Sequence, residues 1–165
     1  MATALVLSML GVALAAPEMI PETEDQDLIG RTAPDFELSM MDGSTFKLSE
    51  HRGKPVVLAF WASWCGPCRL ELPALDAYAV EHPDVLIVAV NVDRELKDAE
   101  KFLRQVSVDL PVALDAESRV MGNFSVYTMP TTILLDPNGT VKLFKIGYGK
   151  EKGLSELDAA INGLK

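Results

Sequence analysis

Two cysteines with two residues between them are the side chains of this sequence best suited to chemistry. Cys65 and Cys68 are the only cysteines among the 165 residues, and Gly66 and Pro67 separate them. A disulfide that closes so short a loop removes little entropy from the unfolded chain, so it would be a weak structural brace. The pair is therefore better explained as a reactive dithiol or as part of a metal site.

The metal-site explanation lacks ligands. A structural zinc site needs four ligands, and this chain has no second cysteine pair. Its two histidines, His51 and His82, fit no standard spacing with the cysteines. Thiolates also favour Cu(I), for which Met129 is the one further candidate ligand. We therefore expect no metal and no bound cofactor, and keep a copper-binding module as an alternative.

The redox explanation accounts for the residues between the cysteines. Gly66 permits a tight bend, and Pro67 is favoured at an early position of a helix. Free amides and the helix dipole stabilise an anion there, which lowers the pKa of a thiol. We expect Cys65 to be exposed and nucleophilic, and Cys68, one turn further in, to be shielded and to resolve the mixed disulfide.

The order of apolar runs predicts an α/β domain that carries the cysteines at the edge of a sheet. Strands alternate with helices before a final hairpin and helix, which indicates three layers. Open α/β sheets commonly bind ligands at the carboxyl ends of their strands. The expected strands are 36–38, 45–47, 54–62, 84–93, 110–115 and two within 131–147, and the expected helices are 65–82, with Leu70 and Leu72 on its apolar face, 95–106, 117–124 and 154–164.

The stretch "FWASWCGPCRLELP", residues 60–73, resembles the active site of thioredoxin-fold proteins. More narrowly, it resembles TlpA-like and ResA-like thiol-disulfide oxidoreductases, of the redoxin and AhpC/TSA-related superfamily. "GRTAPDFEL", "DGSTFKLSEHRGKPVVL" and "YTMPTTILLDPNGTV" extend the resemblance over about residues 28–165. It implies a thioredoxin-like α/β/α sandwich with an N-terminal β-hairpin and a central αβ insertion.

The resemblance also implies an active-site geometry. It implies a redox-active Cys65–Cys68 disulfide and a cis bond between Met129 and Pro130, with Pro130 packed against the dithiol. Cis X-Pro bonds are a small minority, so the residues alone would not establish this one. The cis-proline loop of this fold exposes backbone with which a substrate chain pairs.

Glu71 is the third residue to which the resemblance gives a chemical role. Thioredoxins carry a buried acid in the strand before the active site, and Ala59 stands at that place here. TlpA-like and ResA-like proteins instead have an acid six residues after the first cysteine, which tunes or deprotonates the thiols, and Glu71 matches it. An exposed helical glutamate is the alternative. The residues expected to contact substrate are Trp64, Gly66, Pro67 and Met129.

The beginning of the chain predicts export. The apolar run from Ala2 to Ala16 is short for a membrane span, which needs roughly 20 apolar residues. Ala13-Leu14-Ala15 matches a small-x-small cleavage signal, although no Lys or Arg precedes the run. We predict a signal peptide or N-terminal anchor at 1–15, an acidic linker at 16–27 and the thioredoxin-like domain at 28–165. A periplasmic or other extracytoplasmic bacterial location follows.

The net charge of the chain limits the classes of partner that it can bind. The chain has 24 acidic and 15 basic residues and a formal net charge of -9, so nucleic acids and anionic lipid surfaces would be repelled. We expect a monomer that reduces protein disulfides, for example in cytochrome c or copper-site maturation, and that is recharged by a membrane electron donor through thiol-disulfide exchange.

Other redox functions are open at this point. A disulfide oxidase or isomerase would use the same dithiol in the other direction. "TAPDFEL" also resembles the start of peroxiredoxins, which are peroxidases. Their catalytic motif has Pro and Ser or Thr before the cysteine, and Leu58 and Ala62 stand at those places here, so a peroxidase is disfavoured.

Overall fold

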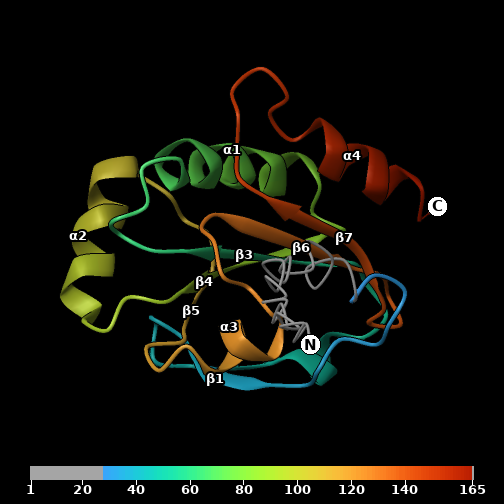
Figure 1. The fold of residues 1–165 in the computed structure, drawn as a ribbon, viewed down its shortest axis with the longest axis horizontal. Coiled ribbons are helices and arrows are strands. Elements are labelled where there is room, and N and C mark those ends of the chain that lie inside the picture. Colours follow the sequence, from blue (N-terminus) through green and yellow to red (C-terminus); the bar gives the residue numbers. More distant parts are fainter. Residues whose placement is uncertain (1–27, 165) are drawn as a thin grey trace, which may run out of the picture.

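The computed structural model describes residues 28–164. The predicted signal peptide or anchor at 1–15 and the linker at 16–27 lie outside the described residues. The described chain forms the predicted α/β domain (Figure 1). Its elements are β1 (Glu37–Ser39), β2 (Thr45–Lys47), the 3₁₀ helix η2 (Leu48–His51), β3 (Val56–Trp61), α1 (Cys68–Glu81), β4 (Leu86–Asn91), α2 (Leu96–Val106), β5 (Val112–Leu114), α3 (Arg119–Asn123), β6 (Thr131–Leu135), β7 (Val141–Ile146) and α4 (Ser155–Asn162).

The strand that leads to the cysteines is the centre of the main sheet. Five strands lie in the order β5-β4-β3-β6-β7. β3 is parallel to β4 and antiparallel to β6, so both of its edges are paired. All six residues of β3 are buried, as a strand covered on both faces requires. This explains its uninterrupted apolar sequence.

Alternate residues of β3 enter two apolar clusters on opposite faces of the sheet. Leu58 and Phe60 pack in a cluster with the β1–β2 hairpin and α3. Ala59 and Trp61 pack in a second cluster with α1, α2 and α4. Figure 1 shows α1 and α4 on one side of the sheet and α3 with β1 on the other. These are the predicted three layers.

Two further features match the expected thioredoxin-like fold. β1 and β2 form the N-terminal antiparallel hairpin, which continues to the sheet through a bridge between Met40 and Ala113 of β5. Between β4 and β6 the chain adds α2, β5 and α3, which is consistent with the predicted central insertion. None of the helices within residues 28–164 is long and apolar enough to cross a membrane.

The first turn of α1 departs from the expected pattern. Leu70, expected on the apolar face, is 42% exposed, whereas Glu71 is 1% exposed. Leu72, Leu75 and Tyr78 are buried as the spacing predicts. The turn after Cys68 therefore directs Glu71, and not Leu70, toward the sheet.

Gly139 occupies a conformation that other residues rarely adopt. It closes the turn between β6 and β7 with a φ of +80°, and its N–H donates to the Asp136 carbonyl at 2.8 Å. A Cβ at this position would meet the guanidinium of Arg52. We expect Gly139→Ala to lower the free energy of unfolding by about 1–2 kcal/mol, the cost of left-handed backbone, in a urea titration.

Gly122→Ala is the matched control. Gly122 lies in α3 and has no left-handed φ, and a Cβ there would have no atom within 4 Å. This substitution should leave the free energy of unfolding unchanged or raise it by less than about 1 kcal/mol. Equal losses in both variants would contradict the conformational explanation.

Candidate active site

The cysteines lie at the junction of β3 and α1. β3 ends at Trp61, and a turn closed by the Cys65 N–H on the Ala62 carbonyl, at 3.1 Å, leads to the helix. α1 begins at Cys68, and Cys65 and Cys68 form a disulfide. β3 therefore places the dithiol at the carboxyl end of the central strand, as the order of elements predicts.

Cys65 is less accessible than the sequence indicated, whereas Cys68 is shielded as expected. Cys65, expected to be exposed, is only 4% exposed, and Cys68 is fully buried. The reason is that both pack in the apolar cluster beneath α1, together with Trp61 and Leu72. In the disulfide state a substrate can reach only a small part of Cys65, and Cys68 is closed off.

The start of α1 acts directly on the sulfur of Cys65. The Cys68 backbone N–H donates to Cys65 Sγ at 3.3 Å. This N–H is one of the first of the helix, where backbone amides lack partners within the helix and the dipole favours negative charge. The same arrangement favours a thiolate at Cys65 once the disulfide is reduced.

Glu71 is buried between α1 and the sheet. Its Oε1 accepts a hydrogen bond from Thr132 Oγ1 at 2.8 Å, while its buried Oε2 has no hydrogen-bond partner among the described residues. Burial raises the pKa of Glu71 to about 7, although the Thr132 hydrogen bond and the positive charge of Lys145 oppose this shift. A group with this pKa can take up and release a proton near neutral pH.

The surroundings of Glu71 explain how a helix residue reaches the sheet. Thr132 of β6 pairs with Ala59 of β3 on one side and with Lys145 of β7 on the other. Ala59 has no side chain beyond Cβ at the position where thioredoxins carry their acid. The carboxyl group of Glu71 thus approaches the same row of the sheet from the helix.

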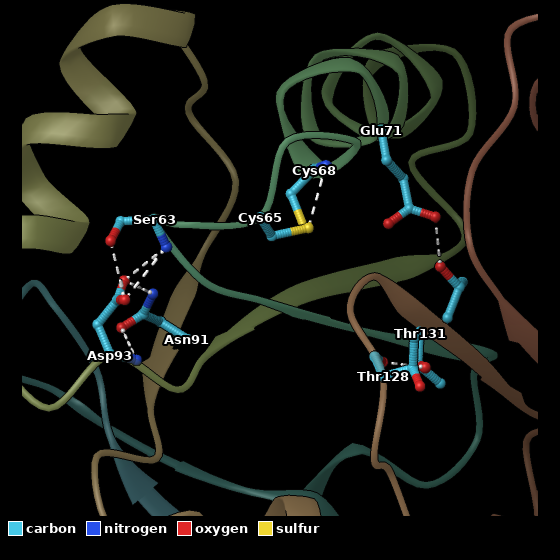
Figure 2. The surroundings of a disulfide bond; sticks show 9 residues. Ser63, Cys65, Cys68, Glu71, Asn91, Asp93, Thr128 and Thr131 are labelled. Carbon is cyan, nitrogen blue, oxygen red and sulfur yellow. Dashed lines mark hydrogen bonds between the residues drawn. A yellow bond between two sulfur atoms is a disulfide. The ribbon is translucent and has the colours of Figure 1, made fainter.

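Three polar residues near the dithiol were not identified from the sequence. We call Ser63, Asn91 and Asp93 the Asp93 cluster. Ser63 lies between β3 and Cys65, and the other two lie at the end of β4. Figure 2 shows the disulfide between this cluster and Glu71. The run "NVD" after an apolar strand was the available signal, but only the pairing of β3 with β4 brings it to Ser63.

The expected contact residues surround the disulfide unequally. Trp64 is 72% exposed, Gly66 and Pro67 are exposed, and Met129 is half-buried against the cluster that holds both cysteines. The Met129–Pro130 bond is cis, and Pro130 is buried. A groove of about 440 Å³ adjoins the site, with Trp64, Asp93, Tyr127 and Met129 among its lining residues.

Metal ligands do not gather at this site. Within residues 28–164, no group of three or more His, Cys, Asp or Glu side chains is arranged to hold a metal ion. The described site is therefore a dithiol with two buried carboxylates near it, Glu71 and Asp93.

Comparison with known proteins gives the same family from sequence and from structure. Residues 29–144 match the AhpC/TSA family. Thiol-disulfide oxidoreductase ResA of Geobacillus thermodenitrificans is 40% identical over 116 residues, which are 69% of this chain and 67% of the relative. The thioredoxin-like protein YneN of Bacillus subtilis is 33% identical over 131 residues, 77% of this chain and 76% of the relative.

Solved structures agree with these relatives. A candidate thiol:disulfide interchange protein DsbE from Chlorobium tepidum has a TM-score of 0.77 at 38% identity, and the match covers 82% of this chain and 96% of that chain. StoA from Bacillus subtilis has a TM-score of 0.65 at 27% identity, covering 77% and 96%. The chain therefore belongs to the AhpC/TSA family, within which it is a thioredoxin-fold thiol-disulfide oxidoreductase similar to ResA.

Proposed function

We propose that this protein reduces disulfide bonds of exported proteins by exchange at Cys65 and Cys68. The observation that carries the proposal is the disulfide at the start of α1, where the Cys68 N–H contacts Cys65 Sγ. Cys65 is the more exposed of the two cysteines, so its sulfur is the one that reacts with the substrate. The relatives named ResA are thiol-disulfide oxidoreductases, which supports the same chemistry here.

The exchange runs in two displacements. The Cys65 thiolate attacks one sulfur of the substrate disulfide; that bond breaks, a mixed disulfide forms, and the released substrate thiolate takes up a proton. Cys68 then loses its proton and attacks Cys65 Sγ, which releases the second substrate thiolate. Two electrons pass to the substrate, and the protein is left with the Cys65–Cys68 disulfide. A donor dithiol restores it by the reverse exchange.

Glu71 serves as the proton acceptor for Cys68 in this scheme. It lies on the same helix, three residues after Cys68, and its buried carboxyl has a pKa raised to about 7 by desolvation. Its second oxygen is free of hydrogen bonds from the described residues, so it can accept a proton. Near pH 7 a large fraction of Glu71 is ionised and ready to do so.

The substrate is held by the surface around Cys65. Trp64, Gly66 and Pro67 form the exposed rim, and Met129 and Pro130 contribute the cis-proline loop on the other side. The groove beside Trp64 and Met129 has room for side chains that flank the substrate cysteine. These residues contact the substrate and supply no electrons.

The proposal extends to the cellular location of the protein, its electron donor and its substrates. Residues 1–15 act as a signal peptide or membrane anchor, 16–27 as an acidic linker, and 28–165 as a monomeric catalytic domain outside the cytoplasm. Such a compartment requires a membrane electron donor of the thiol-disulfide exchange type. Cysteines of apocytochrome c before haem attachment, or those of a copper site during maturation, are the proposed substrate class.

The direction of electron flow is tested by the reduction potential of the Cys65–Cys68 pair. The Gly-Pro pair between the cysteines resembles the corresponding pair in reducing thioredoxins. We expect a potential near or below about -250 mV, on the thioredoxin side of the scale, after equilibration in glutathione or dithiothreitol buffers. A value near about -120 mV, like that of DsbA, would instead make the protein an oxidant.

Serine substitutions test the two sulfur roles. Cys65→Ser should abolish reduction of a test protein disulfide and should form no mixed disulfide, because the nucleophile is gone. Cys68→Ser should accumulate a mixed disulfide that mass spectrometry detects and dithiothreitol releases, because the resolving thiol is gone. If both variants kept full activity, the exchange scheme would be wrong.

Glu71→Gln tests the buried carboxyl. Resolution of the mixed disulfide at pH 7 should slow by about a hundredfold, a typical loss for a missing proton acceptor. The stability of the oxidised protein gives a second readout. The pKa of Glu71 is about 7 in the folded protein, against an ordinary value of 4.5. The unfolded chain therefore releases this proton first, and the free energy of unfolding should fall as pH rises from about 4.5 through 7, by up to roughly 3 kcal/mol.

Glu71→Gln should remove this pH-dependent loss, so the variant should be more stable than the wild type at pH 8. Glu81→Gln is the matched control, because Glu81 is an exposed glutamate of the same helix. It should keep both the wild-type resolution rate and the wild-type pH dependence. An unchanged profile in Glu71→Gln would leave Glu71 without a role in proton transfer.

A further inference from the structure

Asp93 is a buried carboxylate that the exchange steps do not use. It is 7% exposed. Ser63 donates to it twice, through its N–H at 2.9 Å and through its Oγ at 2.9 Å, and Asn91 Nδ2 donates at 2.8 Å. Both carboxylate oxygens are thus hydrogen-bonded, which is what a buried carboxylate charge requires. The Asp93 cluster therefore holds a negative charge at a fixed place.

The two Ser63 contacts fix the turn that presents Cys65. The turn is closed by the Cys65 N–H on the Ala62 carbonyl, and Ser63 lies inside it. Asp93 itself is held by β4, because its N–H donates to Asn91 Oδ1 at 3.1 Å and Asn91 pairs with Trp61 of β3. The position of Cys65 is in this way tied to two neighbouring strands, and not only to the helix that follows.

Figure 2 shows the Asp93 carboxylate on the Ser63 side of the disulfide that includes Cys65. A negative charge near a thiol disfavours the thiolate, in opposition to the start of α1, which favours it. Arg94, Glu95 and Asp98 line the same groove, but all three are exposed, so solvent and salt screen them. On the other side of the disulfide lies the buried carboxyl group of Glu71, which feels the positive charge of Lys145.

We propose that Asp93 is a positioning residue for the exchange reaction: its carboxylate holds the turn that presents Cys65, and its charge opposes ionisation of the Cys65 thiol. A less stable thiolate makes the reduced protein a stronger electron donor, because a stabilised reduced form is what makes an oxidant of DsbA. Asp93 therefore biases the pair toward reduction of substrates. This inference rests on the exchange at Cys65 and Cys68 proposed above.

Asp93→Asn is the first variant, because it keeps an acceptor for Ser63 and removes the charge. The pKa of the Cys65 thiol is measured from the pH dependence of its reaction with iodoacetamide, and the potential in a glutathione buffer. We expect a lower thiol pKa, a reaction rate at pH 7 that rises about threefold to tenfold, and a less negative potential. An unchanged or higher thiol pKa would overturn the proposed effect of the charge.

Ser63→Ala tests the positioning contact and keeps the charge. It removes the hydroxyl donor and leaves the Ser63 N–H contact. The thiol pKa should stay near that of the wild type. The rate of the reduced protein with oxidised glutathione, normalised to the thiolate fraction, should fall at least about threefold because the turn is held less firmly. A wild-type rate would overturn the positioning role, which this variant tests even if Asp93→Asn does not fold.

Asp136→Asn is the matched control. The Asp136 carboxylate also orders a loop, accepting the N–H groups of Asn138 and Thr140 at 2.9 Å each. It follows Leu135, which pairs with Val56 at the opposite end of β3 from Cys65. This variant should lose stability with the thiol pKa and potential unchanged. Cys65→Ser tests the proposed exchange separately from the role of Asp93. If Cys65→Ser still reduced disulfides, the exchange mechanism would be refuted, whereas the Asp93 and Ser63 variants test only the role of Asp93.

Discussion

The turn between β3 and α1 is the constraint on which the site depends. It must bring a buried central strand to the surface, present Cys65 there, and begin a helix at Cys68 within a few residues. The Cys68 N–H is free to contact Cys65 Sγ because the helix begins at Cys68, where backbone amides have no partner within the helix. The polarity of the sulfur environment is therefore set by backbone geometry, which the pairing of β3 with β4 and β6 holds in place.

Two buried carboxylates near the dithiol differ in their hydrogen bonds, and this separates their roles. Glu71 accepts one hydrogen bond, and its other oxygen has no partner among residues 28–164, so desolvation raises its pKa into the range where protons are exchanged. Asp93 accepts hydrogen bonds on both oxygens, from Ser63 and Asn91. The first arrangement suits a group that gains and loses a proton, and the second suits a group that keeps its place.

The sequence predicted the elements better than it predicted the site. The apolar run of β3 and the spacing of Leu72, Leu75 and Tyr78 contain the burial pattern directly, because strands and helices alternate their faces with fixed periods. The pattern misplaced Leu70, which is exposed while its neighbour Glu71 is buried. Polar groups at functional sites break hydrophobic patterns, so burial of Glu71 could be expected only from the family resemblance. Asp93 required the pairing of two strands far apart in sequence.

The contact between Glu71 and Thr132 joins α1 to the strand that follows the cis-proline loop. Thr132 lies two residues after Pro130, on the strand that follows the cis-proline loop. The hydroxyl of Thr132 thus joins the strand after the loop to the helix that carries Glu71. A weaker hydrogen bond would raise the pKa of Glu71 further, since this bond opposes the effect of burial. An acid carried by the helix thus contacts the strand after the cis-proline loop, whereas an acid at Ala59 would belong to the central strand itself.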